Sequence, residues 1–120
     1  MALGVEMITF DCTDPDRLAD WWAAAVGGTA TAVMAGEFVM VSQAEGPRLG
    51  FQRVDDPTPG KNRVHVDFTA ADVEAEVRRL VELGATETAR HSFGDAFSWV
   101  VLADPDGNAF CVAAAAEYAH

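Results

Sequence analysis

The spacing of hydrophobic residues changes along the chain in a way that marks its elements. Residues 4–12 form a short apolar run with β-branched and aromatic side chains, which predicts a strand. Asp14 and Pro15 predict the start of a helix, because Asp is a common N-cap residue and Pro fits the first helical turn. Apolar residues then recur at helical spacing until the glycine pair at residues 27–28. Three further short strands are expected at residues 29–34, 38–43 and 49–54.

The same order of elements starts again in the second half. Residues 55–62, DDPTPGKN, are polar and rich in Pro and Gly, which predicts an exposed linker. A strand is expected at residues 63–69 and a helix at residues 72–83, followed by Gly84. The closing strands are expected at residues 86–90, 97–103 and 109–113, and the turn sequence DPDG joins the last two.

The two halves also share side chains. At an offset of 58 residues, MITFDCTD (7–14) aligns with HVDFTAAD (65–72), which pairs the strand phenylalanines and the helix-capping aspartates. Near the ends of the halves, GFQ (50–52) aligns with AFC (109–111). A chance recurrence of element order is the alternative, since ferredoxin-like folds also alternate strands and helices. We predict a single α+β domain over residues 1–120, with βαβββ repeats at about 4–54 and 63–115 and a linker at 55–62.

The charge balance narrows the range of partners. The 120 residues carry 19 Asp and Glu against 8 Lys and Arg, for a formal net charge of -11. Such a chain repels nucleic acid and anionic membrane surfaces, so neither is expected as a partner. Small molecules that are neutral or cationic stay possible ligands.

The N-terminal residues show no signal-peptide pattern, and no apolar run approaches the roughly 20 residues of a membrane span. We therefore expect a cytoplasmic protein in which Cys12 and Cys111 are reduced thiols. The sequence also lacks a C-x-x-C pair, a glycine-rich phosphate loop, G-x-S-x-G and H-E-x-x-H. Its chemistry has to be sought in the repeats.

Three segments resemble a known superfamily. They are TFDCTDPDRLADWWAAAVGG, RVHVDFTAADVEAEVRRLVELGA and ADPDGNAFCV, which are spread along nearly the whole chain, from residue 9 to residue 112. They resemble the first strand and helix, the central strand and second helix, and the closing turn and strand of the glyoxalase, bleomycin-resistance and extradiol-dioxygenase superfamily. These proteins are also called vicinal oxygen chelate (VOC) proteins. The R-V-H-x-D stretch and the final F-C-V look most like the glyoxalase-like subgroup common in actinobacteria.

The resemblance implies a particular architecture. Two βαβββ units would form an eight-stranded, cup-shaped mixed sheet with its helices on the convex side. A ligand cleft would lie on the concave face. In this superfamily the cleft is often completed by a second copy, so a homodimer is expected.

The resemblance also implies where a metal would bind. In metal-using members the ligands come from equivalent positions on the first, fourth, fifth and eighth strands, usually as His, Gln and Glu. Here these positions would be Met7, Gln52, His65 and Cys111. Only His65 and Gln52 are of a favoured type, and no carboxylate lies at a matching position, so we expect no metal cofactor. A divalent ion, if one binds, would use His65 and Gln52, and Asp67 shares the face of His65.

Taken without the superfamily, His, Cys and Met are soft ligands that could hold copper or zinc. One imidazole and one thiolate leave such a coordination sphere short of ligands. This reading therefore adds little support for a bound metal.

His65 and Asp67 are the candidate catalytic residues. Side chains two positions apart on a strand share a face and lie about 6–7 Å apart along it, so a hydrogen bond between them is possible. A carboxylate beside an imidazole favours the protonated ring, which suits proton transfer near neutral pH. The alternative is a histidine satisfied by its neighbours, beside a carboxylate that only lines the cleft. The candidate ligand-binding residues are Met7, Thr9, Gln52, Trp99 and Cys111.

Two function hypotheses of different classes follow. The first is a protein that binds a small organic molecule in the cleft without a metal, as resistance-type members that sequester an antibiotic do. The second is a glyoxalase-like lyase or isomerase that uses His65 as general base or as its single strong metal ligand. A third, an accessory domain, would associate through Trp21 and the apolar residues 113–116. We favour the first, because the scaffold motifs persist while two ligand positions have changed.

Overall fold

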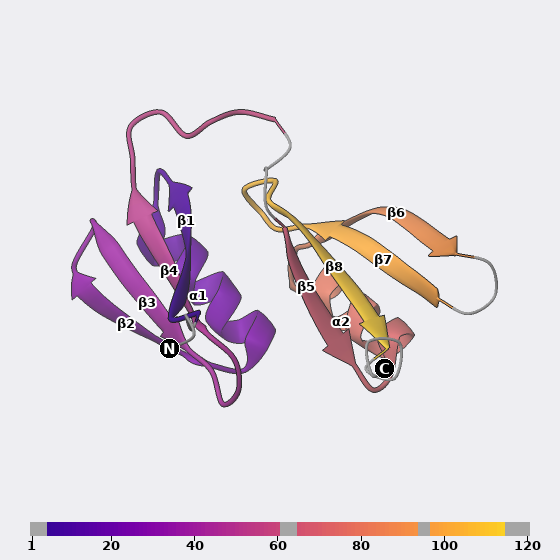
Figure 1. The fold of residues 1–120 in the computed structure, drawn as a ribbon. Coiled ribbons are helices and arrows are strands. Elements are labelled where there is room, and N and C mark those ends of the chain that lie inside the picture. Colours follow the sequence, from indigo (N-terminus) through magenta and orange to yellow (C-terminus); the bar gives the residue numbers. More distant parts are fainter. Residues whose placement is uncertain (1–4, 61–64, 94–96, 115–120) are drawn as a thin grey trace. The chain divides into compact units, whose positions relative to one another are not determined.

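The computed structural model describes residues 5–60, 65–93 and 97–114. In this part of the chain the order strand, helix and three strands occurs twice (Figure 1). The α+β class and the two βαβββ repeats are therefore confirmed. The elements are β1 (Met7–Cys12), α1 (Pro15–Val26), β2 (Thr29–Met34), β3 (Phe38–Ser42), β4 (Arg48–Arg53), β5 (Val66–Ala70), α2 (Val73–Leu83), β6 (Thr86–Phe93), β7 (Phe97–Ala103) and β8 (Ala109–Ala114).

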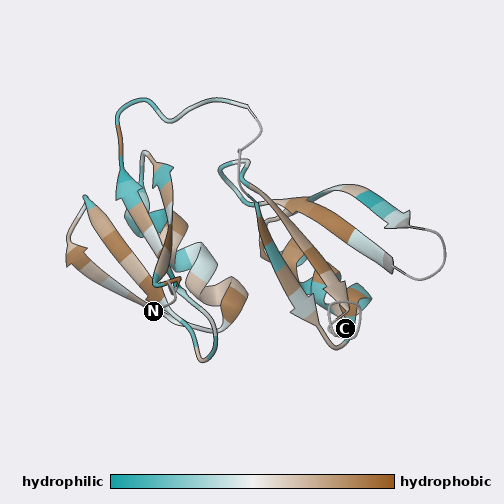
Figure 2. Ribbon diagram, in the orientation of Figure 1, coloured by the Kyte–Doolittle hydropathy of each residue, from teal (hydrophilic) through white to brown (hydrophobic). Residues whose placement is uncertain are grey.

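The chain forms two compact units, Met1–Thr58 and Pro59–His120, which we call unit 1 and unit 2. Their boundary falls inside the expected linker, whose described part, residues 55–60, has neither helix nor strand and is largely hydrophilic (Figure 2). The expected start of the fifth strand at residues 63–64 and the apolar residues 115–116 lie outside the described residues. Neither described helix has the length and apolar character that crossing a membrane requires.

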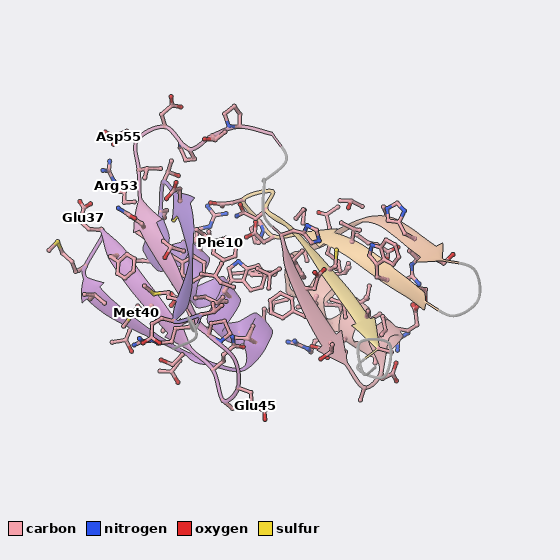
Figure 3. All side chains as sticks on the ribbon, viewed as in Figure 1. Phe10, Glu37, Met40, Glu45, Arg53 and Asp55 are labelled. Atoms are coloured by element: carbon pink, nitrogen blue, oxygen red, sulfur yellow. The ribbon has the colours of Figure 1, made fainter. Side chains whose placement is uncertain are left out.

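In unit 1 the strands follow the order β1-β4-β3-β2, with β1 parallel to β4 and the other pairs antiparallel. One face of the sheet packs against α1. Phe10, labelled in Figure 3, stacks on Phe51 at 5.2 Å and lies 5.6 Å from Trp22 of α1, measured between ring centroids. Trp21 is half-buried and meets Trp22 edge-on at 5.0 Å. The side chain of Asp14 caps α1, as the sequence predicts, by accepting a hydrogen bond of 3.2 Å from the backbone N–H of Arg17.

Unit 2 has the corresponding order β5-β8-β7-β6. Its core lies between the sheet and α2, where Val77 and Leu80 of the helix are buried. Phe68 and Phe110, from the paired strands β5 and β8, meet edge to face at 5.8 Å. Asp72 caps α2 by accepting a backbone hydrogen bond of 3.1 Å. The same rules of capping and burial thus build both units.

An ion-pair network joins β6 to α2. Arg90 donates hydrogen bonds to Glu74 at 2.6 and 2.9 Å and to Glu87 at 2.8 and 3.1 Å. These bonds lower the pKa of both Glu74 and Glu87 and raise the pKa of Arg90. Because Arg90 reaches the helix, its side chain marks the helix-covered side of the sheet, and His91 follows on the opposite side.

The turn sequence between β7 and β8 is held by a buried carboxylate. One oxygen of Asp104 accepts the backbone N–H groups of Asp106 and Asn108 at 2.9 and 2.8 Å. The side-chain amide of Asn108 donates to both oxygens of Asp104, at 3.1 and 2.8 Å. Asp104 is therefore satisfied and has a structural role, because a buried carboxylate needs such partners. The turn sets the point at which β8 begins.

The strand register corrects one detail of the repeat. Thr9 and Asp67 are equivalent at the offset of 58, and their parallel partners are Gly50 and Cys111. Gly50 is therefore the counterpart of Cys111, whereas Gln52 pairs with Asp11 further along the strand. The expected alignment of residues 50–52 with 109–111 was two residues out. A shift of two keeps every side chain on its own face, so alternation along the strand cannot detect it.

Candidate functional site

Three chemically distinct side chains meet on the face of the unit 2 sheet opposite α2, which we call the helix-free face of unit 2. His65 directly precedes β5, Asp67 lies within it, and Cys111 is the β8 partner of Asp67. The Nε2 atom of His65 lies 3.3 Å from Oδ1 of Asp67. One potential ligand atom from each of the three residues lies within 4.8 Å of the other two. We call these three residues the unit 2 triad.

The local sequence explains why these side chains converge. The period of two puts His65 and Asp67 on one face, and parallel pairing puts Cys111 beside Asp67. The side chains of His65 and Asp67 are 47% and 50% exposed, whereas Cys111 is only 5% exposed. The triad is therefore a buried thiol with an imidazole and a carboxylate at the surface beside it.

An aromatic pair lies on the same face. Trp99 of β7 is the cross-strand partner of Ala113, which shares the face of Cys111 two residues along β8. The ring of Trp99 is half-buried and lies 5.3 Å from that of His91, with the two planes tilted by 34°. This register places Trp99 outside the core that α2 covers, as a ligand-binding role requires.

Unit 1 carries different chemistry at the equivalent positions. A side chain at Gly50 would come within 2.9 Å of the sulfur of Met7, 3.0 Å of the hydroxyl of Thr9 and 3.1 Å of the ring of Phe38. The place that Cys111 takes in unit 2 is thus filled by neighbouring side chains in unit 1. Met40, labelled in Figure 3, is the β3 partner of Gly50 and completes this surface, the helix-free face of unit 1.

Met7 and Thr9 are among the ligand-binding residues expected from the sequence, and the methionines Met7, Met34 and Met40 suit an adaptable pocket, whereas Phe38 and the role of Gly50 were not expected. The alternation in β3 could have indicated Phe38, because it lies two residues from Met40 and so shares its face. Gln52 lies on the same face as Gly50, two residues away, and is exposed. It belongs to unit 1 and His65 to unit 2, so the expected metal pair is divided between the units.

These residues do not fit the hard divalent ion that the superfamily implies. The corrected equivalents of the four ligand positions are Met7, Gly50, His65 and Cys111. They supply a thioether, no side chain, an imidazole and a thiol, whereas Mg²⁺ and Mn²⁺ select carboxylate, carbonyl and water oxygens. Gln52 stands two residues further along β4, opposite Asp11, and does not restore the set.

A βαβββ unit that occurs twice, with each sheet ordered first-fourth-third-second, defines the VOC class of fold. The sequence matches the glyoxalase-like domain family over residues 7–113. The chain therefore belongs to this family, as the resemblance predicts.

Solved structures show the same fold. The chain superimposes on a glyoxalase/bleomycin resistance protein/dioxygenase family enzyme from Burkholderia phytofirmans PsJN, with a TM-score of 0.79 and 16% identity over 93% of this chain and 98% of that one. It is also similar to lactoylglutathione lyase from Agrobacterium tumefaciens, with a TM-score of 0.73 and 15% identity over 98% of both chains. TioX from Micromonospora sp. ML1 gives 0.68 and 16% over 93% and 98%. No curated protein matches the sequence.

Proposed function

We propose that this protein binds a small organic molecule, neutral or cationic, on the helix-free face of unit 2, and that binding requires no metal. The observation that supports this most directly is the unit 2 triad beside Trp99. Its exposed imidazole and carboxylate offer hydrogen bonds and a negative charge, and the indole offers a surface for stacking. The net charge of -11 favours cationic ligands.

The metal-free part of the proposal rests on unit 1. Its positions equivalent to His65, Asp67 and Cys111 are Met7, Thr9 and Gly50, which offer no imidazole, carboxylate or thiol. Unit 1 therefore supplies none of these three metal-ligand types at the equivalent positions. The participation of Met7, Thr9 and Gln52 in ligand binding and the formation of a homodimer stay predictions.

Isothermal titration calorimetry on metal-stripped protein tests the proposal. The panel consists of cationic glycopeptides and planar aromatic metabolites, with neutral and cationic members. At least one compound should bind, and Asp67→Asn should weaken a cationic ligand by about tenfold, the worth of one charge-assisted hydrogen bond. Trp99→Ala should weaken a planar ligand in the same assay.

Glu82→Gln is the matched control for Asp67→Asn. It removes the same charge from an exposed position on α2, on the opposite side of the unit 2 sheet. Affinity should not change in this variant. Failure of the whole panel to bind, or an equal loss in both variants, would rule the proposal out.

The 3.3 Å contact between His65 and Asp67 supports a second candidate, a glyoxalase-like lyase or isomerase. In this function His65 is the general base and Asp67 orients it, because a base needs a partner that fixes its ring. Product formation from small oxygenated carbonyl compounds, followed by NMR, should then be lost in His65→Gln. Turnover that survives this substitution would exclude the mechanism.

A further inference from the structure

We propose that His65, Asp67 and Cys111 form a binding site for a thiophilic divalent cation, of which Zn²⁺ is the representative, and that this site is complete within unit 2. The proposal goes beyond the proposed function, which needs no metal. It arises from the disagreement between the residues present and the hard-ion site implied by the superfamily. Unit 1 has no ligand side chain at Gly50, and unit 2 brings three possible ligands together. These two observations are independent of each other.

The separations within the triad are close to those of a zinc site. Two nitrogen or oxygen ligands at tetrahedral angles around zinc lie about 3.3–3.4 Å apart, given bond lengths of about 2.0–2.1 Å. The observed distance between Nε2 of His65 and Oδ1 of Asp67 is 3.3 Å. A thiolate and an imidazole that bind the same ion lie about 3.6 Å apart. The three candidate ligand atoms of the triad lie within 4.8 Å of one another, so they need to move only a short way closer together to bind one ion. The exposed side chains of His65 and Asp67 can make that approach by rotation.

The ligand types determine which ion is selected. On binding, the thiol of Cys111 releases its proton to solvent and a sulfur–metal bond forms, with no change of oxidation state. The thiolate and the carboxylate then balance the two charges of the cation. A thiolate and an imidazole favour Zn²⁺, Cd²⁺ or Co²⁺ over Mg²⁺ and Mn²⁺. Three protein ligands leave a fourth tetrahedral position for water or an added ligand.

Co²⁺ titration of the metal-stripped full chain is the direct test, because a thiolate bound to Co²⁺ gives a charge-transfer absorption. One Co²⁺ per chain should bind with this absorption, and Zn²⁺ should displace it, whereas Mg²⁺ and Mn²⁺ should not. Cys111→Ser should abolish the absorption. The Zn²⁺ affinity of His65→Gln and Asp67→Asn can be measured by competition with a chromophoric chelator. It should be lower by about a hundredfold, because the loss of a residue that only hydrogen-bonds to a metal ligand can already cost that much.

Two control variants separate the triad from other soft ligands. Cys12→Ala removes the buried thiol of unit 1, which donates to the backbone carbonyl of Gln52. His91→Gln removes an imidazole from the same face of unit 2. Both should retain the Co²⁺ absorption and the Zn²⁺ affinity. His65 and Asp67 are exposed, so their variants test the site even if Cys111→Ser fails to fold.

The proposal is overturned by absence of binding, by equal binding of Mn²⁺, or by Zn²⁺ affinity that is the same in the triad variants and the wild type. An equal loss in His91→Gln would point to adventitious histidine binding and would also overturn it. The organic ligands are titrated on metal-stripped protein, so the two proposals are tested separately. The protein can bind Zn²⁺ and no organic ligand, or an organic ligand and no Zn²⁺, and the experiments distinguish these outcomes.

Discussion

The two units have the same fold and differ in the chemistry of one face. On the helix-covered side both use aromatic side chains, Phe10 with Phe51 in unit 1 and Phe68 with Phe110 in unit 2. On the helix-free side, unit 1 carries thioether, phenyl and hydroxyl groups around a glycine, and unit 2 carries the triad. The covered faces have to exclude water and so resemble each other, whereas folding imposes no such demand on the helix-free faces. The candidate site lies where the units differ.

The largest expected effect tests whether the covered faces are energetically equivalent. Phe51 of β4 and Phe110 of β8 are both buried. Phe51→Ala and Phe110→Ala should each lower the free energy of unfolding by about 3–5 kcal/mol, because each leaves a cavity in a packed core. Urea unfolding followed by circular dichroism measures both.

Val81→Ala, at an exposed position of α2, is the control and should cost less than about 1 kcal/mol. If Phe51→Ala and Phe110→Ala differed by more than about 2 kcal/mol, the two cores would not be equivalent. The two units would then share their topology but not the energetics of their cores.

A smaller effect is expected at the turns that precede β4 and β8. Asp104 accepts several hydrogen bonds while buried, whereas the turn of unit 1 has one side-chain bond, from Gln43 to the carbonyl of Pro47 at 2.7 Å. Asp104→Ala should cost about 2–3 kcal/mol, because it leaves backbone N–H groups unsatisfied, and Gln43→Ala about 1 kcal/mol. Equal costs in urea unfolding would contradict a special role for the DPDGN turn.

The sequence predicts the elements well because their signals are local. Asp14 and Asp72 cap helices, and alternation assigns His65 and Asp67 to one face, as the structure shows. The position in unit 2 that is equivalent to Gly50 could not be found from such local signals. The mistaken alignment matched Phe51 with Phe110, two identical side chains, and only the pairing of strands distant in sequence reveals the shift.

The triad shows the same limit. Each of its members could be named from the sequence, but the reach of Asp67 to His65 depends on side-chain rotamers, and its distance to Cys111 depends on the pairing of β5 with β8. We expected no metal cofactor because no carboxylate lies at a matching position, although alternation along the strand already places Asp67 on the face of His65. Asp67 lies two residues from the matching position, and parallel pairing brings it beside the thiol.

The Arg90 network of unit 2 gives a pH-dependent effect. Because Arg90 lowers the pKa of Glu74 and Glu87 in the folded chain, their contribution is present above the unfolded value of 4.5 and is lost as the pH falls through the folded values. At neutral pH the Glu74→Gln/Glu87→Gln double variant should have the lower urea midpoint. The difference should shrink below about pH 4.5 and in high salt. A difference that grows on acidification would contradict the assigned direction of the pKa shifts.

The smallest expected effect concerns the unit 2 triad itself and bears most on function. His65→Gln and Asp67→Asn should each change the free energy of unfolding by less than about 0.5 kcal/mol, because a polar contact between two exposed side chains contributes little to stability. Urea unfolding at neutral pH on metal-stripped protein measures this. A cost above about 1 kcal/mol would favour the alternative in which His65 is a structural histidine satisfied by its neighbours. A negligible cost, together with loss of ligand or cation binding in the same variants, would mean that unit 2 keeps its polar face for binding and that folding does not require it.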